Sequence, residues 1–403
     1  MLRNMEDYID IVGAETIATI YKKASKLYGR HLININSTFQ GGGVAEILSR
    51  LVPMMNNVGV DTGWRILHGN PTFFEITKKF HNALQSGDIN LTAMKKKIYL
   101  EVNQEFAIYT HFNHDCVILH DPQPLPLVKY SHKRQPWVWR CHIDLSNPNK
   151  ELWEFLKQFI LRYDLVIFSS EDYKKADLPV EQKVIHPAID PLALKNRDLS
   201  KADILKYVTK AGIPTDKPII SQISRMDPWK DPEGVLDVFD YVKKQVDCRL
   251  VFCYNLASDD PEGMEIYSRV YKKAEDWVKR GDVFFVVGNN DILVNAIQRF
   301  SSVILQKSIR EGFSLTVTEA LWKARPVVAS NVGAIPVQVI DRQTGFLVEA
   351  TDYKGCADRV VELLKKPALA ERIGKQAKEH VRQNFLTTRL LLDYLNIVGD
   401  LVK

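Results

Sequence analysis

The chain has 403 residues, of which 45% are hydrophobic and 26% charged, proportions that are ordinary for a soluble globular protein. Its net charge is only +5 and its basic residues form no tail or stripe, so nucleic acid is not an expected partner. No run approaches the ~18 apolar residues of a membrane span, and the N-terminus carries no secretory stretch. With five scattered cysteines, these features predict a cytoplasmic protein.

The first half of the chain predicts helices that alternate with strands. Residues 1–30 predict a helical leader, 31–36 a strand, and about 44–55 the helix that follows a glycine-rich turn. Further strands are predicted at 63–67, 116–120, 138–141, 165–168 and 183–185. Such alternation is typical of a parallel sheet covered by helices.

The same alternation restarts after a proline-rich and then polar stretch, 187–200, which predicts a linker. Strands are predicted at 218–223, 248–252, 283–287, 303–306, 326–329 and 345–348, and a helix at 387–402. We therefore predict an α/β protein with two Rossmann-like, doubly wound parallel-sheet domains, residues 1–190 and 191–385. Such a pair binds ligands at the carboxyl ends of strands, in the cleft between the domains.

A glycine-rich turn, Ser37-Thr-Phe-Gln-Gly-Gly-Gly43, follows the first predicted strand. The dinucleotide fingerprint G-x-G-x-x-G fails because position 46 is Glu, and no P-loop signature is present. A triple glycine is either a flexible turn or a loop that lets backbone approach a ligand. Its place directly after the first strand favours the ligand-facing interpretation.

Two cations follow the first strand of the second half, in Arg225-Met-Asp-Pro-Trp-Lys230. A guanidinium fork and an ammonium on a stiff, proline-containing loop are suited to clamping a diphosphate. The alternative is a solvated basic pair. The acids described next lie in the same predicted domain, and this coincidence favours the clamp.

Two acids, Glu311 and Glu319, flank a predicted strand-to-helix loop in which the helix starts near Thr316 and runs to about Ala324. Glu319 is thereby expected in the first helical turn. The unpaired amides of a helix N-terminus attract anions, so the stretch suits a ligand with phosphate between two hydroxyl-bearing groups, a nucleotide sugar. The alternative is that Thr316-x-x-Glu319 is only a capping box.

Polar clusters also end two neighbouring strands of the first half. Asp121 lies between a strand and two prolines that force a turn, and His142 and Asp144 end the next strand. Each residue alone is as well explained as a hydrogen-bonded core group. Together at neighbouring strand tips they indicate ligands for sugar hydroxyls.

The Glu311-x7-Glu319 spacing and the Arg225-x4-Lys230 element resemble those of retaining GT-B glycosyltransferases of family 4. The resemblance implies that Glu311 contacts the donor sugar, that Glu319 holds the ribose hydroxyls, and that the two cations bind the donor phosphates. It also implies two domains facing across a cleft, with a C-terminal helix, about 386–403, packed back onto the first domain. Where many relatives carry Gly after the Lys, this chain has Asp231.

The stretches Phe80-His-Asn-Ala-Leu-Gln85 and Trp139-Arg-Cys-His-Ile-Asp-Leu-Ser146 resemble one subgroup of that family, the trehalose glycosyl-transferring synthases of thermophilic prokaryotes, and the related trehalose phosphorylases. This resemblance implies catalytic roles for Arg225, Lys230, Glu311, His142 and Asp121. It implies donor binding by Gly42, Gly43, Gly312, Phe313, Ser314, Leu315, Thr316 and Glu319. It implies acceptor binding by Gln40, His81, Asn82 and Asp144.

The expected activity is transfer of glucose from a nucleoside-diphosphate-glucose (UDP, ADP or GDP) to glucose, forming α,α-trehalose with retention. No Asp-x-Asp occurs and His111-x-x-His114 lacks a third ligand, so no metal or other cofactor is expected. Two alternatives stay open: a trehalose phosphorylase that uses glucose 1-phosphate, and a non-catalytic sugar or nucleotide sensor. The expected partners are sugars and the nucleotide sugar; a homodimer and reversibility are left open.

Overall fold

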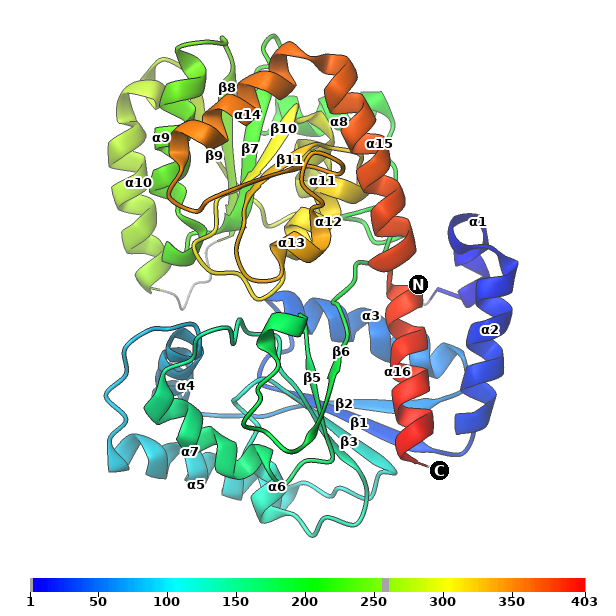
Figure 1. Ribbon diagram of the computed structural model, residues 1–403. Coiled ribbons are helices and arrows are strands. Elements are labelled where there is room, and N and C mark those ends of the chain that lie inside the picture. Colours follow the sequence, from blue (N-terminus) through cyan, green and yellow to red (C-terminus); the bar gives the residue numbers. More distant parts are fainter. Residues whose placement is uncertain (1–2, 256–260, 403) are drawn as a thin grey trace. The chain divides into compact units, whose positions relative to one another are not determined.

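The computed structural model describes residues 3–255 and 261–402, which fall into two compact units (Figure 1). The first unit comprises the chain up to Ala188 together with the residues from Thr387 onward. The second unit comprises Ile189–Leu386. Among the described residues, no helix has the length and apolarity needed to cross a membrane.

The first unit is built on a six-stranded parallel sheet with the order β2-β1-β3-β4-β5-β6. Its strands are β1 (His31–Asn36), β2 (Asp61–Ile66), β3 (Cys116–His120), β4 (Trp137–Arg140), β5 (Leu165–Phe168) and β6 (Glu181–Val184). Every residue of β3, β4 and β5 is buried, as expected for strands covered on both faces. All the strands predicted for this half are confirmed, with ends that shift by a residue or two.

Helices of the first unit begin where the sequence supplies caps. The Asn70, Thr92 and Asn149 side chains accept backbone N–H groups at the starts of α4, α5 and α7. The longer helices are α2 (Ala14–Ala24), α3 (Gly43–Asn57), α4 (Pro71–Leu84), α5 (Ala93–Tyr109), α7 (Lys150–Ile160) and α16 (Thr387–Leu401). Short turns are η1 (Met5–Tyr8), α1 (Ile9–Val12), η2 (Ser25–Leu27), α6 (Leu127–Tyr130) and η3 (Glu171–Tyr173).

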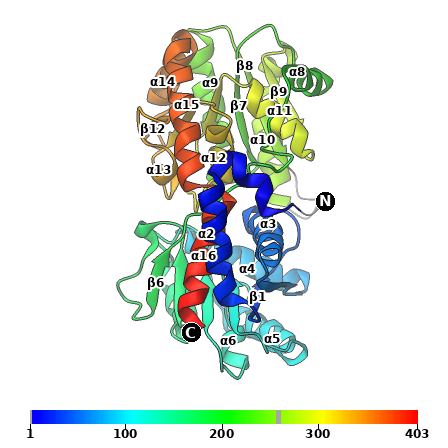
Figure 2. The ribbon, with the colours of Figure 1, turned by 90° about the vertical axis from the view of Figure 1, so that its right-hand side faces the viewer.

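The C-terminal helix α16 belongs to the first unit. It packs against α2 and α3, as both views show (Figures 1 and 2). One face of α16 is buried through Leu390, Leu391, Tyr394, Leu395 and Val398. The Arg389 guanidinium also donates to the carbonyl of His186 at 2.6 Å, which ties the helix to the segment that leaves β6.

The second unit repeats the architecture with a parallel sheet of order β12-β11-β10-β7-β8-β9. Its strands are β7 (Ile219–Arg225), β8 (Arg249–Asn255), β9 (Val283–Val287), β10 (Val303–Gln306), β11 (Val327–Ser330) and β12 (Phe346–Val348). Its helices are α8 (Lys201–Lys210), η4 (Pro228–Lys230), α9 (Pro232–Lys243), α10 (Pro261–Lys279), α11 (Asp291–Phe300), α12 (Leu315–Trp322), α13 (Ile335–Gln338), α14 (Tyr353–Lys365) and α15 (Pro367–Asn384). The predicted α/β class with two doubly wound sheets is confirmed.

Each sheet has a point at which the strand order reverses. In the first unit β1 lies between β2 and β3, and in the second β7 lies between β8 and β10. Ligands of open parallel sheets bind outside the carboxyl ends of the strands at such a switch point. The glycine-rich turn and Asp121 follow β1 and β3, whereas Lys230 and Glu311 follow β7 and β10.

The chain passes from the first unit to the second between Ala188 and Ile189, inside the predicted linker 187–200, but the polar part of that stretch is folded. Asn196 is buried, and Asn295 on α11 donates to the carbonyls of Leu194 and Arg197 at 2.9 and 2.8 Å. Arg299 on the same helix donates to the carbonyl of Asn196 at 3.1 Å. These backbone carbonyls are satisfied by buried polar side chains, so the segment is a folded part of the second unit.

Candidate active site

Helix α12 begins one residue earlier than the sequence predicts. Ser314 occupies the N-cap position and Leu315 is the first helical residue, so Glu319 lies in the second turn rather than the first. Thr316 is therefore inside the helix, and its hydroxyl is hydrogen-bonded to the Ser314 hydroxyl at 3.0 Å. The capping-box alternative is wrong, because Thr316 is not the N-cap. Ala324, predicted within the helix, lies beyond its end with φ 56°.

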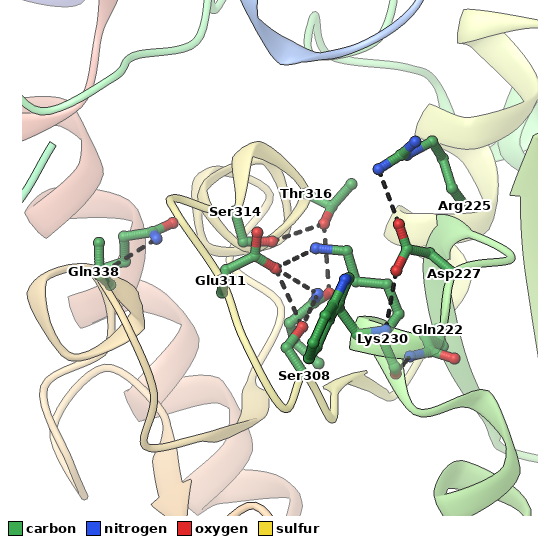
Figure 3. Close-up of polar contacts among 12 residues, drawn as sticks. Gln222, Arg225, Asp227, Lys230, Ser308, Glu311, Ser314, Thr316 and Gln338 are labelled. Atoms are coloured by element: carbon green, nitrogen blue, oxygen red, sulfur yellow. Dashed lines mark hydrogen bonds and ion pairs between the residues drawn. The ribbon is translucent and has the colours of Figure 1, made fainter. Parts of the chain in front are cut away.

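An ion pair joins the ends of two neighbouring strands at this point (Figure 3). The Lys230 ammonium lies 2.5 Å from Oε2 of Glu311, whose side chain is only 7% exposed. Gln306 and the Ser308 hydroxyl each donate to the same carboxylate oxygen at 3.1 Å. Gln222 on β7 donates to the Lys230 carbonyl at 2.7 Å, which fixes the loop. A buried carboxylate with one cation and two neutral donors is well compensated.

Arg225, the last residue of β7, forms the second cation of this loop. Its guanidinium lies 2.9 Å from Asp227, and its side chain is 54% exposed. Asp227 also accepts the Trp229 N–H at 2.9 Å and so starts the turn η4 that carries Lys230. Figure 3 shows Arg225 paired with Asp227 while Lys230 is directed at Glu311. The loop thus presents one exposed and one partly buried cation.

Asp231 adopts the left-handed conformation that glycine favours, with φ 46° and ψ 54°. Its Oδ1 accepts the Gly234 N–H at 3.0 Å and caps α9. Aspartate tolerates this region because its short side chain can bond to nearby backbone. The departure from the family pattern therefore keeps a turn that a glycine would also make.

Glu319 is buried, with 1% of its surface exposed. Its Oε1 lies 3.6 Å from the Lys195 ammonium, and Gln298 on α11 donates to its Oε2 at 3.3 Å. Sequence reasoning missed Lys195, since the residue lies in the polar stretch interpreted as a linker and carries no motif. A buried carboxylate next to a partly exposed lysine forms a second polar centre near the N-terminus of α12.

In the first unit, Asp121 and His142 lie together at the ends of β3 and β4. Oδ1 of Asp121 accepts the backbone N–H of His142 at 2.7 Å, and the Trp139 indole donates to the Asp121 carbonyl at 2.9 Å. Asp121 has φ 64°, an uncommon conformation that these contacts hold. Burial raises the pKa of its carboxyl to about 7, although the His142 N–H and the Arg140 charge act in the opposite direction.

His142 stacks on His120, the last residue of β3, with ring centroids 5.4 Å apart. Burial lowers the pKa of His120 to about 3 and that of His142 well below its ordinary value, and the Arg140 charge adds to both shifts. The Arg140 guanidinium is itself fixed by the carbonyls of Phe168 and Ile185, at 2.8 and 2.5 Å. Both imidazoles are therefore neutral at neutral pH.

The remaining acceptor-side candidates lie on nearby elements of the same unit. Asp144 is buried, and its Oδ1 accepts both the N–H and the hydroxyl of Ser146, at 2.9 and 2.6 Å. His81 and Asn82 lie near the end of α4, where the Ala83 carbonyl accepts the N–H of Asn149, the residue that caps α7. The structure thus connects the end of α4 to the loop that follows Asp144.

The glycine-rich turn has the backbone that its sequence predicts. Gly41 and Gly42 have φ 80° and 87°, a region that L-residues rarely adopt, and Gly42 is the N-cap of α3. Gly43 is the first residue of that helix, and the side chain of Gln40 before the glycines is exposed. Backbone at this strand end is open to a ligand.

Five donor-side candidates, residues 312–316, form the loop that follows Glu311 and the first turn of α12. Ser314 and Thr316 lie beside the Lys230–Glu311 pair (Figure 3), and Phe313 packs against Phe385 with ring centroids 5.8 Å apart. Within the part of the chain that the structure describes, no three His, Cys, Asp or Glu side chains lie close enough together to hold a metal ion.

Two family models match the chain. The model described as "Trehalose synthase, N-terminal domain" matches residues 34–175, and "Glycosyl transferases group 1" matches residues 203–380. The trehalose synthases of Thermococcus litoralis and Pyrococcus furiosus are each 44% identical over 404 residues, covering 99% of this chain and 97% of theirs. A trehalose phosphorylase of Pleurotus pulmonarius is 28% identical over 437 residues, covering 94% of this chain and 59% of the fungal protein.

Solved structures share the fold at low sequence identity. Sucrose-phosphate synthase from Thermosynechococcus elongatus superimposes with a TM-score of 0.73 at 17% identity, covering 91% of this chain and 98% of that one. A trehalose-phosphate synthase from Burkholderia xenovorans gives a TM-score of 0.74 at 14% identity, covering 93% and 100%. These similarities identify the fold as GT-B, as predicted.

Proposed function

Because the chain belongs to the trehalose synthase family of glycosyltransferases, and is thus a hexosyltransferase, we propose that it transfers glucose from a nucleoside-diphosphate-glucose to the anomeric hydroxyl of glucose. The product is α,α-trehalose, and the configuration of the donor carbon is retained. The observation that carries the proposal is the Lys230–Glu311 ion pair, set between the strand ends of β7 and β10 beside the N-terminus of α12.

This arrangement suits a leaving diphosphate. The helix amides near Ser314 attract anions, and Arg225 and Lys230 supply two positive charges on one loop. As the donor bond breaks, negative charge grows on the phosphate oxygens, and fixed cations stabilise that charge more than they stabilise the intact donor. Glu311 is held in place by three donors, and we assign it to accept hydrogen bonds from hydroxyls of the donor sugar.

The transfer itself requires no protein nucleophile. The bond between the donor's anomeric carbon and the phosphate oxygen breaks, and a bond to the acceptor oxygen forms on the same face of that carbon. The proton of the acceptor hydroxyl passes to the departing phosphate oxygen. We assign Glu319 to the ribose hydroxyls, and Asp121, His142 and Asp144 to the sugars.

A trehalose phosphorylase is the second candidate, favoured by the 28% identity that extends over 94% of this chain. It would use the same cations for inorganic phosphate or glucose 1-phosphate. The buried carboxylate of Glu319 supports the synthase instead, because a phosphorylase has no ribose for it to hold.

Product analysis with glucose as acceptor tests the proposal. UDP-, ADP- and GDP-glucose are supplied separately, and trehalose and the free nucleoside diphosphate are quantified together. We expect both products in equal amounts with at least one donor. Trehalose formed only from glucose 1-phosphate, with release of inorganic phosphate, would establish the phosphorylase. The Lys230→Ala variant serves as the control for catalysis at this site.

We also propose a cytoplasmic setting, which is supported by the state of the cysteines. All five are buried free thiols. Disulfides are rare in reducing compartments and frequent in secreted proteins.

A further inference from the structure

Three polar side chains of the first unit form a continuous chain from the middle of β1 to the candidate acceptor site. Oδ1 of Asn34 lies 3.0 Å from Nε2 of His120, and Nδ1 of His120 lies 3.0 Å from Nε2 of His142. Asn34 and His120 are buried, whereas His142 is partly exposed. This series of hydrogen bonds therefore starts inside the sheet at Asn34 and ends at the surface of the site at His142.

The direction of these hydrogen bonds follows from their first member. A carbonyl-type oxygen only accepts, so Nε2 of His120 must carry the proton that it shares with Asn34. A neutral imidazole has one N–H, which leaves Nδ1 of His120 as an acceptor. Nε2 of His142 must then donate to it. Burial and the Arg140 charge keep both rings neutral, and a second proton on His120 would set two N–H groups against each other.

The His142 side chain is thereby left with one uncommitted nitrogen, Nδ1. Its backbone N–H donates to Asp121 and its Nε2 donates to His120. Its Nδ1 forms no hydrogen bond to any residue that the structure describes and, in this tautomer, bears a lone pair.

We propose that Asn34 and His120 are positioning residues that fix the tautomer of His142, so that Nδ1 accepts a hydrogen bond from a hydroxyl of the acceptor sugar. The identity of that ligand rests on the proposed function; the tautomer itself does not. In the opposite tautomer Nδ1 would present an N–H, and the same hydroxyl would have to accept. The two arrangements therefore select different orientations of a sugar hydroxyl that binds there, and so fix how the acceptor sits.

Nitrogen NMR of the ¹⁵N-histidine-labelled protein at neutral pH tests the tautomer without a substrate. The chain contains internal standards among its ten histidines. In His380, Nε2 faces the Val337 carbonyl at 3.3 Å and Nδ1 faces the Asn384 amide nitrogen at 3.3 Å, so Nδ1 is unprotonated. In His186, Nδ1 faces the Ser169 carbonyl at 2.9 Å and is protonated.

We expect Nδ1 of His142 to resonate with the unprotonated Nδ1 of His380. Resonances are assigned from their loss in His142→Gln, His380→Gln and His186→Gln. A protonated Nδ1 in His142, as in His186, or a doubly protonated ring would overturn the proposal. This outcome is independent of whether the donor is a nucleotide sugar.

The variant Asn34→Leu removes the acceptor that orients the hydrogen bonds from Asn34 through His120 to His142. Its matched control is Asn36→Leu, which removes a second buried amide from the same strand; that amide is bonded to Trp64 and Thr38 and lies outside the imidazole chain. We expect the Nδ1 signal of His142 to shift toward the protonated position in Asn34→Leu and to stay unchanged in Asn36→Leu.

Kinetics of the same variant separate positioning from a merely structural role. In Asn34→Leu, kcat/KM for the acceptor glucose should fall about tenfold, the effect of losing one neutral hydrogen bond, while KM for the donor stays within about twofold. An unchanged His142 spectrum in Asn34→Leu would show that Asn34 does not set the tautomer. An altered spectrum with unchanged acceptor kinetics would show that Nδ1 does not serve the acceptor.

Discussion

Lys230 and Glu311 form an ion pair with 2.5 Å between Nζ and Oε2, although 81 residues separate them along the chain. Both side chains are largely buried, with 17% and 7% of their surface exposed. In the free protein each charge therefore neutralises the other. On the proposed function, a bound donor would change this balance, since its phosphates would attract the ammonium and its sugar hydroxyls would donate to the carboxylate.

Lys230→Ala should reduce both stability and turnover. It leaves the buried Glu311 carboxylate without its cation, which costs about 3 kcal/mol in the free energy of unfolding, and it removes a charge stabiliser worth about 10²-fold in kcat. Urea unfolding and steady-state kinetics measure the two effects. The double variant with Glu311→Gln should regain much of the stability and none of the turnover.

Lys243→Ala is the matched control for that prediction. Lys243 pairs with Asp282 at 2.6 Å and has a similar exposure, 21%, but it follows no strand end of the site. The Lys243→Ala variant should lose stability and keep the turnover of the wild type. Equal turnover in Lys230→Ala and Lys243→Ala would contradict the phosphate role.

Arg225→Ala should affect turnover alone. Because its guanidinium is half exposed and pairs with Asp227 at the surface, we expect a change in the free energy of unfolding of no more than about 0.5 kcal/mol. Turnover should fall by about 10²-fold. Arg269→Ala, which removes an ion-paired arginine of 53% exposure on α10, should leave turnover at the wild-type level. An Arg225→Ala enzyme that is as active as this control would remove Arg225 from the clamp.

Variants of Glu311 and Glu319 should differ in which ligand they affect, the free nucleoside diphosphate or the intact donor. Glu319→Ala is expected to weaken binding of the free nucleoside diphosphate by about 30-fold or more, because a buried charged group that bonds the ribose is lost. Glu311→Ala should leave that affinity nearly unchanged and reduce turnover of the intact donor, whose sugar it is proposed to hold. Calorimetric titration with the diphosphate and with the full donor distinguishes these results. Unchanged diphosphate affinity in Glu319→Ala and Glu319→Gln would favour the phosphorylase.

Asp121 should make the protein less stable as the pH rises from about 4 to about 7. Burial raises the pKa of its carboxyl from 3.8 to about 7, so in this window the unfolded chain has lost a proton that the folded chain keeps. Unfolding releases that proton, and rising pH favours it. Relative to the wild type, Asp121→Asn should therefore gain stability between pH 4.5 and 7 in urea unfolding.

Asp115→Asn is the control for the predicted direction of the change in stability with pH. Burial alone would raise the pKa of Asp115, but bonds from the His31 N–H and from Arg30 outweigh it and lower the pKa. Its contribution changes only below about pH 4, and the difference from wild type should be flat between pH 4.5 and 7. If the difference in stability between Asp121→Asn and the wild type were also constant between pH 4.5 and 7, the raised pKa of Asp121 would be refuted.

Chelation should leave the activity intact. In the proposed clamp, Arg225 and Lys230 balance the negative charge of the diphosphate, a role that a divalent metal ion would otherwise have. The sequence also has no Asp-x-Asp motif for such an ion. Trehalose formation is measured after dialysis against EDTA, with and without added magnesium or manganese. Activity that is lost and then restored by either ion would require a different site.

Most of the strands could be predicted from the sequence because they contain a short apolar run bounded by turn residues, as in 116–120 and 303–306. The start of α12 could not be fixed in this way. Ser314 and Thr316 are both good N-cap residues, and the choice between them depends on how the loop from Glu311 packs. An N-cap at Ser314 instead of Thr316, two residues earlier, moves Glu319 from the first helical turn to the second.

Partners that lie far apart in the chain could not be predicted. His120 bonds Asn34 across 86 residues, and neither residue belongs to a motif that indicates the other. Lys195 was missed for a related reason: a polar stretch without periodicity looks like a linker, whereas here it is held by Asn295 and Arg299. Sheet topology, which brings strand ends together, is the information that the linear sequence lacks.

The return of the chain from Leu386 to Thr387 has a consequence for biosynthesis. Ile189–Leu386 form the second unit and are translated before α16, whose Leu391 and Tyr394 are buried in the first unit. At about 5 to 20 residues per second, the ribosome needs roughly 10 to 40 s for that intervening stretch. During this time the nascent first unit exposes the apolar surface that α16 later covers. The unit that emerges first is thus the one that is completed last, and this interval is when chaperones would have a surface to bind.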